Sequence, residues 1–339
     1  MQKIYNTSMA NFWEKLNKPI ITLAPMAGVT DIAFRQICKQ FGADVIFTEF
    51  ASTNALVFGS DKTIDMLRFA ESERPVVVQL FGNDPEMFAR AAKIVADLGF
   101  DGIDINFGCP AYKVVKHGGG VALMRNLPLC RAIIEATIKA TCLPVSIKIR
   151  ASICKETPLK KGKRKIKACG QPITALDLVE TIKDLPVASL MIHARSFETP
   201  FDGEPNVEIV KKVREIWPGI LIYNGGVYSP ETAKQMLEQT GADGIGLARG
   251  AWGRPWLFEQ VKNYLRTGSY NHPDRNEIKQ IIIQHASLAL KQKGDHGLIE
   301  LRKHLVKYVK GWPEAASLRA KLVQVKSLDE IREILKNTP

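Results

Sequence analysis

Short apolar stretches alternate with amphipathic stretches eight times over the first three quarters of the chain. The apolar stretches are too hydrophobic to leave one face in water, so we expect strands that are buried on both faces. Strands of this kind, joined by helices, run parallel in one sheet. The eight expected strands are ITLAPM (21–26), DVIFTEF (44–50), PVVVQLFG (75–82), GIDIN (102–106), PVSIKIR (144–150), ASLMIHA (188–194), GILIYNGG (219–226) and DGIGLARG (243–250).

Eight such units predict an α/β fold, the (β/α)8 or TIM barrel, in which the parallel strands close on themselves. An open doubly wound sheet is the alternative, and it carries a glycine fingerprint after a strand. The stretch GIGLAR (244–249) has Arg249 where the third glycine of GxGxxG would stand, so that match fails. The regular period therefore favours the closed barrel, which we assign to residues 1–265.

The strand pattern stops near residue 270, after the turn-rich stretch NHPDR (271–275). Residues 277–294 and 296–311 then place apolar residues three and four apart, and residues 327–337 open with Ser327 as an N-cap. We expect a small all-α domain over 270–339. Residues 151–171 show neither period, and we expect them to form a long basic loop at the carboxyl end of a barrel strand.

The positive charge is concentrated in two regions of the chain. The net formal charge is +12. Residues 151–170 contain seven Lys or Arg and one acidic residue. Residues 259–339 contain 15 Lys or Arg and nine acidic residues. Such clustering indicates a polyanionic partner, and a solvated basic surface is the alternative.

The composition points to neither a membrane nor an oxidising compartment. No stretch reaches the roughly 18 apolar residues of a membrane span, and MQKIYNTSMANFWEKLNK at the start lacks the apolar core of a secretory signal. The six cysteines form no CxxC pair and no dense framework. A reduced, cytoplasmic setting is therefore expected.

Glycine-bearing loops follow the last two expected strands, at NGG (224–226) and LARG (247–250). Barrels of this fold bind phosphate at these two loops, through backbone N–H groups. Two ordinary turns are the alternative. The adjacent position of the two loops favours a phosphate site.

Two further strand ends carry a basic side chain inside an apolar run. Lys148 is either a cation directed at a ligand, such as a reduced flavin, or a member of an ion pair with Glu49 or Asp104. His193 either contacts a ligand or is an ordinary core histidine. A buried polar group without a partner costs about 1–3 kcal/mol, so a ligand is a reasonable partner.

Six dispersed motifs, in this order along the chain, together resemble the tRNA-dihydrouridine synthases. They are APMAGVTD (24–31), NFGCP (106–110), KIR (148–150), IHAR (192–195), NGG (224–226) and ARGAWGRPWLF (248–258). The stretch LRKHLVKYVKGWPEAASLR (301–319) also resembles the helical tRNA-binding domain of the bacterial B-type enzymes. The resemblance covers residues 18–320.

This resemblance implies that FMN binds at the barrel mouth and is reduced by NADPH (or NADH). A uridine flipped out of tRNA then receives a hydride at C6, and a cysteine protonates C5. Cys109 matches that general acid, and a thiol with the ordinary pKa of about 8.5 is protonated at neutral pH. We expect the glycines at 118–120 to let the loop that carries Cys109 fold over the flipped base.

The remaining site residues are carried over from the same resemblance. Those expected to contact the flavin, its pyrimidine edge or its phosphate are Pro25, Met26, Ala27, Gln79, Lys148, His193, Asn224, Gly225, Gly226, Ala248 and Arg249. Those expected to contact the substrate are Asn106, which would help to hold the uracil, Arg150, Lys303, Lys307 and Lys310.

The chain departs from the family pattern in its lysine-rich insertion at 155–167 and in Gly226, where Asp or Ser is frequent. Another FMN barrel, such as a dihydroorotate dehydrogenase or an ene-reductase, would leave the basic helical domain unexplained. An RNA-binding protein without activity would leave Cys109 and Lys148 unexplained. We therefore expect tRNA as the partner, position 17 as the target, and no protein partner, membrane or metal.

Overall fold

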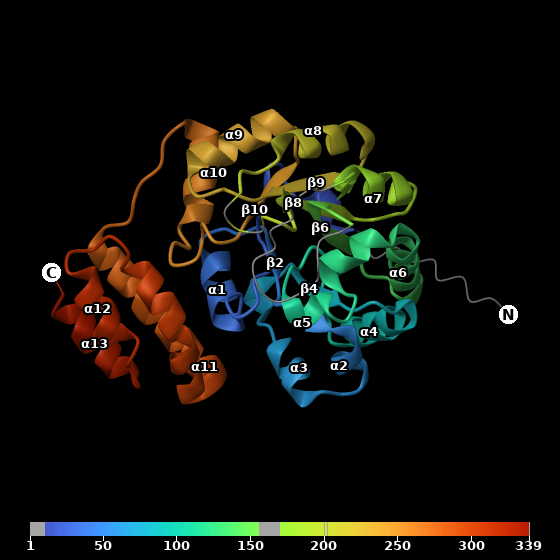
Figure 1. The fold of residues 1–339 in the computed structure, drawn as a ribbon. Helices are drawn as coiled ribbons and strands as arrows, with labels where there is room; N and C mark the ends of the chain where they lie inside the picture. The colour runs from blue at the N-terminus through green and yellow to red at the C-terminus, as the bar shows by residue number, and fades with distance from the viewer. Residues whose placement is uncertain (1–10, 156–169, 200, 202, 339) are drawn as a thin grey trace.

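Eight parallel strands form a closed barrel in the computed structural model, which describes residues 11–155, 170–199, 201 and 203–338 (Figure 1). Neighbouring strands pair in register around the whole ring, and the β2–β4 and β1–β10 pairs complete it. The predicted (β/α)8 barrel is confirmed. The barrel strands are β1 (Ile20–Leu23), β2 (Val45–Phe47), β4 (Val76–Phe81), β5 (Gly102–Phe107), β6 (Val145–Ile153), β8 (Ser189–Ser196), β9 (Ile220–Asn224) and β10 (Gly244–Leu247).

Two short strands lie outside the ring. β3 (Ala51–Ser52) pairs with β4, and β7 (Ile173–Thr174) runs antiparallel to the end of β6. The expectation of a loop from residue 151 is therefore wrong at its start, because residues 151–153 continue β6 and gain hydrogen-bonding partners from β7. Most of the lysine-rich insertion, residues 156–169, lies outside the described residues.

Helices cover the outer surface of the barrel (Figure 1). The α-helices are α1 (Ile32–Gln40), α2 (Thr53–Val57), α3 (Asp61–Met66), α4 (Pro85–Asp97), α5 (Tyr112–Val115), α6 (Leu127–Ala140), α7 (Ala175–Ile182), α8 (Val207–Ile216), α9 (Pro230–Thr240), α10 (Leu257–Thr267), α11 (Arg275–Tyr308), α12 (Ala315–Leu322) and α13 (Leu328–Lys336). Short 3-10 helices are η1 (Phe12–Lys15), η2 (Glu71–Glu73) and η3 (Gly120–Arg125).

The strands are buried on both faces, as their apolar sequences predict. One cluster of buried side chains fills the space between the strands and the surrounding helices. A second cluster lies inside the barrel and includes Val45, Val77 and Ile222. Trp13 of η1 belongs to this inner cluster and packs against Phe47, with 6.2 Å between the ring centroids. Polar side chains replace this apolar filling at the opposite end of the barrel, where the site lies.

The C-terminal helices α11, α12 and α13 lie at one side of the barrel, next to α1 (Figure 1). Helix α11 contains a break at Gly294 (φ 58°), so its two halves are the two helices that the sequence predicts. Gly297 brings these halves together, because a Cβ there would lie 2.2 Å from the carbonyl oxygen of Ala289. The apolar cluster of these helices includes Ile37 of α1, so it joins them to an outer helix of the barrel.

No helix within the described residues is long and apolar enough to cross a membrane. Four cysteines in this part of the chain are free: Cys38, Cys109, Cys130 and Cys142. Cys154 is disulfide-bonded, which differs from a fully reduced set of thiols. Sequence spacing alone carries no signal for a single bond of this kind.

Candidate active site

A cavity of about 490 Å³ lies at the carboxyl ends of the barrel strands. Loops after β1, β5, β8, β9 and β10 form its wall together with side chains from the strands. Every site residue predicted in the barrel lines it: Pro25, Met26, Ala27, Gln79, Asn106, Cys109, Lys148, Arg150, His193, Asn224, Gly225, Gly226, Ala248 and Arg249. The three lysines predicted in the C-terminal helices, Lys303, Lys307 and Lys310, do not line this cavity.

The backbone of Cys109 is held on both sides. Its N–H donates to the side-chain oxygen Oδ1 of Asn106 at 2.8 Å, and its carbonyl oxygen accepts the N–H of Val121 at 3.1 Å. Asn106 Oδ1 also accepts the N–H of Gly108 at 3.0 Å, while Arg150 Nε donates to the Gly108 carbonyl oxygen at 2.7 Å. The thiol is thus attached to a loop segment whose polar backbone groups are already bonded.

Asn106 and Arg150 have a structural role in addition to their predicted contacts with the substrate, which stay predictions. Both side chains line the cavity, yet their hydrogen bonds support the loop that carries Cys109. Sequence reasoning missed these bonds because they join a side chain to backbone two and three residues away, or across to the next strand.

A buried chain of hydrogen bonds supports Asn106 in turn. Asn106 Nδ2 donates to Gln79 Oε1 at 2.8 Å, and Gln79 Nε2 donates to Asp104 Oδ2 at 2.7 Å. Ser146 Oγ donates to Asp104 Oδ1 at 2.7 Å. Burial raises the pKa of Asp104 to about 6, although the hydrogen bonds from Gln79 and Ser146 favour its carboxylate. The network links three neighbouring strands beneath the cavity.

The glycine-rich stretch after Cys109 is a close-packed turn. Gly120 has φ 60°, and a Cβ at this position would lie 2.6 Å from the carbonyl oxygen of Cys109. The turn continues directly into η3. The absence of a side chain at Gly120 therefore lets the chain pass against Cys109, so glycine is needed here for close packing. The folding of this loop over a flipped base stays a prediction.

Lys148 places a cation at the edge of the cavity, and among the described residues it forms no ion pair within 4.0 Å to Glu49 or Asp104. Glu49 instead accepts the N–H of Gly28, and Asp104 belongs to the network above. Burial and the neighbouring Arg150 lower the pKa of Lys148 to about 8, while Asp104 and Cys109 oppose this effect. The side chain is thus a desolvated cation beside the thiol, and the ion-pair alternative is wrong.

His193 lies among cations. Burial is the main cause that lowers its pKa far below the ordinary value, and Arg150, Lys148, Arg195 and Arg249 add to the effect. The imidazole is therefore neutral. Such a concentration of positive charge favours an anionic ligand at this end of the cavity.

The loop after β9 forms a cradle in front of Arg195. Gly225 (φ 126°) and Gly226 (φ 70°) both have conformations that favour glycine. A Cβ on Gly225 would lie 3.0 Å from the His193 ring and 3.5 Å from Arg195 Nη1. Arg195 Nη1 is buried and has no hydrogen-bond partner among the described residues. Arg195 Nε donates to the Gly203 carbonyl oxygen, so the guanidinium group is held in place while Nη1 stays available beside the glycine backbone, an arrangement that fits a phosphate group.

Sequence reasoning missed Arg195 as a site residue, although its signal was present. It stands two residues after His193 on β8, and alternate residues of a strand share one face. Arg195 therefore lines the same cavity as His193.

Aromatic side chains that the sequence did not indicate surround the mouth of the cavity. Phe201 and Tyr228 are exposed, and the guanidinium carbon of Arg249 lies 5.5 Å and 6.0 Å from the centroids of their rings. Tyr112 lies on the wall that follows Cys109. Exposed aromatic rings beside a cation suit the stacking of a planar base.

A second cavity of about 660 Å³ continues from this mouth toward the C-terminal helices. It shares Tyr228, Arg249, Gly250 and Trp252 with the first cavity, and its lining also includes Lys307 and Lys310. Both lysines are exposed, and Lys307 Nζ lies 4.6 Å from the ring centroid of Trp252. We call these two lysines, with Arg249 and Arg254, the basic groove.

Lys303 lies apart from the basic groove. It is partly buried, lines neither of the two cavities, and acts electrostatically on Glu49. The structure therefore separates one of the three predicted lysines from the other two.

Comparisons with known proteins extend along nearly the whole chain. The family described as "Dihydrouridine synthase (Dus)" matches residues 22–338. The "tRNA-dihydrouridine synthase B" of Shewanella oneidensis is 34% identical over 294 residues, covering 86% of this chain and 85% of that protein. The protein of the same name from Pseudomonas aeruginosa is 33% identical over 311 residues, covering 91% of this chain and 89% of that protein.

Among solved structures, histamine dehydrogenase from Rhizobium sp. 4-9 has a TM-score of 0.54 at 15% identity. The match covers 79% of this chain and 49% of that protein. At this level of identity the match establishes a shared barrel fold alone.

Proposed function

The chain belongs to the dihydrouridine synthase family, and we propose that it is an FMN-dependent enzyme that reduces the C5–C6 bond of uridines in the D-loop of tRNA. One observation supports this most strongly. A single cavity joins a cysteine on a fixed loop, a desolvated lysine and an anion cradle, and it opens into the basic groove. We propose a cytoplasmic location, where tRNA is available.

The residues present fit FMN. Gly225, Gly226 and Arg195 would hold its phosphate, because their backbone and the unpartnered guanidinium nitrogen face the same space. Met26 and Lys148 would lie beside the ring system. When bound, FMN supplies the hydride for the reduction, with NADPH as the reductant.

Cys109 is the proposed general acid that gives a proton to C5 of the uracil. A proton donor must stay at hydrogen-bonding distance from the accepting atom, so a loop fixed by Asn106, Arg150 and Val121 suits the role. Lys148 acts electrostatically on Cys109 and adds positive charge beside the reacting base.

The tRNA is proposed to lie along the basic groove. Its phosphates would contact Lys307, Lys310 and Arg254, while Phe201 and Tyr228 would stack against the flipped base. An ene-reductase acts on small molecules, so it would not require a basic groove beside its active site. The B-type resemblance favours position 17 as the target.

The test is to isolate the full-length protein, identify its flavin, and reduce it anaerobically with NADPH. Unmodified tRNA should then reoxidise the flavin and gain dihydrouridine, which mapping of the modified position would locate. Fully modified tRNA is the control and should leave the flavin reduced. Reoxidation by small enones but not by unmodified tRNA would overturn the proposal.

A further inference from the structure

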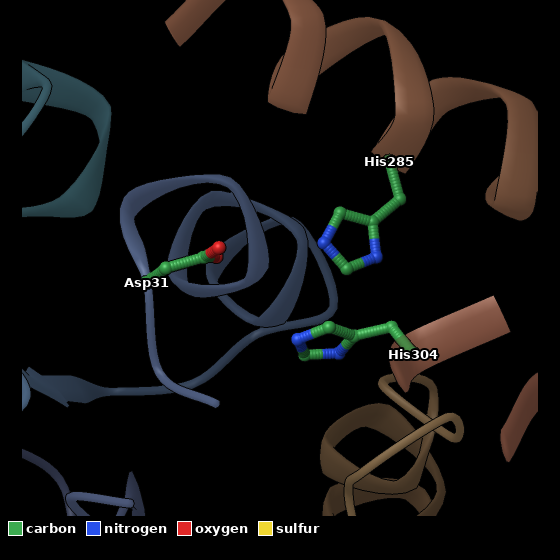
Figure 2. Close-up of side chains that lie close together, drawn as sticks. All are labelled: Asp31, His285 and His304. Carbon is green, nitrogen blue, oxygen red and sulfur yellow. The ribbon is translucent and has the colours of Figure 1, made fainter. Parts of the chain in front are cut away.

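A cluster of metal-ligating side chains lies between the barrel and the C-terminal helices, outside the cavity described above. It consists of Asp31, His285 and His304 (Figure 2). One candidate ligand atom from each side chain lies within 4.8 Å of those of the other two. Figure 2 shows the two imidazole rings next to each other and facing the Asp31 carboxylate.

The three residues come together only in the folded chain. Asp31 is the N-cap of α1, whereas His285 and His304 lie on opposite sides of the break at Gly294 in α11. The imidazole centroids are 4.9 Å apart. Packing of α11 on α1 therefore assembles the cluster, which departs from the expectation of no metal in the sequence analysis.

The cluster is buried and short of hydrogen bonds. Both histidines are fully buried, and Asp31 is 6% exposed. Three ring nitrogens have no hydrogen-bond partner among the described residues: His285 Nε2, His304 Nδ1 and His304 Nε2. Buried polar atoms are normally bonded, so unpartnered imidazole nitrogens beside a carboxylate point to a missing ligand.

The surroundings of Asp31 leave one of its oxygens available. Oδ1 accepts the N–H of Phe34 at 3.0 Å, which is the N-cap bond. Among the described residues, Oδ2 has one distant polar contact, 3.8 Å to the ammonium of Lys293, and that ammonium donates to Glu300 at 2.6 Å. The cation nearest to Asp31 is thus bonded mainly to another carboxylate.

A second contact orients His285 for coordination. Its Nδ1 is hydrogen-bonded to Tyr308 Oη at 3.0 Å, which leaves Nε2 directed into the cluster. Metal-bound histidines typically use their other ring nitrogen in this way. Ligands about 2.1 Å from one ion lie roughly 3–4 Å apart, so small side-chain rotations would complete the site.

We propose that Asp31, His285 and His304 bind one divalent transition-metal ion, of which Zn²⁺ is the best example, and that this ion joins the barrel to the C-terminal helices. Two imidazoles and one carboxylate form a common ligand set for Zn²⁺. The ion would also brace residues 25–30, which precede Asp31 and contribute to the wall of the cavity. This inference is independent of the reaction that the cavity carries out.

The first experiment measures metal directly on untagged full-length protein. The protein is stripped with a chelator, incubated with Zn²⁺ or Co²⁺, freed of excess metal, and analysed for metal per chain. We expect one ion per chain, visible Co²⁺ absorption of a low-symmetry site, and a higher melting temperature with Zn²⁺. Wild-type protein that retains no stoichiometric metal would overturn the proposal.

Matched variants assign the ion to this cluster. His304→Gln and Asp31→Asn should each lower the affinity for Zn²⁺ by more than about 10-fold. Tyr308→Phe should lower this affinity by about 10–100-fold, because it removes the hydrogen bond that orients His285. Asn is also a good N-cap, so Asp31→Asn keeps the start of α1. His296→Gln is the control, because the His296 side chain is 70% exposed on the same helix. Equal affinity in Asp31→Asn, His304→Gln and the control would refute this site.

Discussion

The side-chain oxygen of Asn106 accepts the backbone N–H of Cys109 at 2.8 Å, so the position of the thiol depends on an amide three residues earlier. That amide is itself held by Gln79 at 2.8 Å. The proposed acid is therefore positioned from beneath the cavity, by a buried network that begins at Ser146. The residue proposed to give the proton, Cys109, is therefore distinct from the residues that position it, Asn106 and Gln79.

Replacing Cys109 with alanine should remove the proton donor while leaving the flavin site intact. General acid catalysis contributes typically 10²–10⁴-fold, and we expect a loss in this range. The measurement is the single-turnover rate of flavin reoxidation by unmodified tRNA, with NADPH reduction as the internal check. Cys142→Ala is the control, because Cys142 is exposed and lies outside the cavity. A wild-type rate in Cys109→Ala would exclude the thiol from the mechanism.

Asn106→Ala should slow the same step by about 10–100-fold, since small misplacements of a reacting group are costly. The double variant Asn106→Ala/Cys109→Ala distinguishes positioning from an independent contribution. If Asn106 acts through Cys109, the double variant should react at the rate of Cys109→Ala alone. Additive losses would instead assign Asn106 a direct contact with the substrate, as the family resemblance implies.

The lowered pKa of Lys148 predicts a pH dependence of stability in the flavin-free protein. Its pKa is about 8 in the folded chain against 10.5 ordinarily, so between these values the unfolded chain holds the proton that the folded chain has lost. Stability should therefore rise with pH across this window relative to Lys148→Met, by up to about 1.4 kcal/mol per pH unit. Denaturant unfolding of both proteins at pH 7, 8, 9 and 10 measures it. Parallel curves would show that the cation is not desolvated.

Arg195→Met should selectively weaken binding of the flavin phosphate. A charge-assisted hydrogen bond contributes roughly 1.5–3 kcal/mol, so the wild-type protein should prefer FMN over riboflavin by at least about 10-fold through this contact. The variant should lose that part of the preference while its affinity for riboflavin changes little. Fluorescence titration of the flavin-free proteins with both ligands gives the comparison. An unchanged preference would place the phosphate elsewhere.

The barrel was predictable because eight apolar strands, each followed by a helix at a regular interval, must be buried on both faces. Few folds other than a closed barrel achieve this. The line of residues around the cavity was predictable for a related reason, since the carboxyl ends of parallel strands meet at one face. Arg195 followed from the same alternation along β8 and was overlooked.

Other features depend on contacts that no local pattern carries. The bond between Asn106 and Cys109 depends on how the chain turns after β5, and the role of Gly120 depends on the carbonyl group it passes. His285 and His304 are 19 residues apart and meet Asp31 only because α11 folds back at Gly294 and packs on α1. Such sites need the tertiary fold before they can be seen.

The basic groove should contribute to tRNA affinity through counterion release. Lys307→Gln and Lys310→Gln each remove one potential phosphate contact, so each should flatten the plot of log affinity against log salt by roughly 0.7–0.9. Flavin content should stay constant, because neither lysine lines the flavin cavity. Lys303→Gln should change the slope less, since Lys303 is partly buried outside the groove. Lys139→Gln is the control, because the Lys139 side chain is exposed on α6, across the barrel from the C-terminal helices (Figure 1). The measurement is a set of tRNA-binding isotherms at several salt concentrations. If Lys307→Gln and Lys310→Gln show the same salt slope as Lys139→Gln, the groove is not part of the tRNA-binding surface.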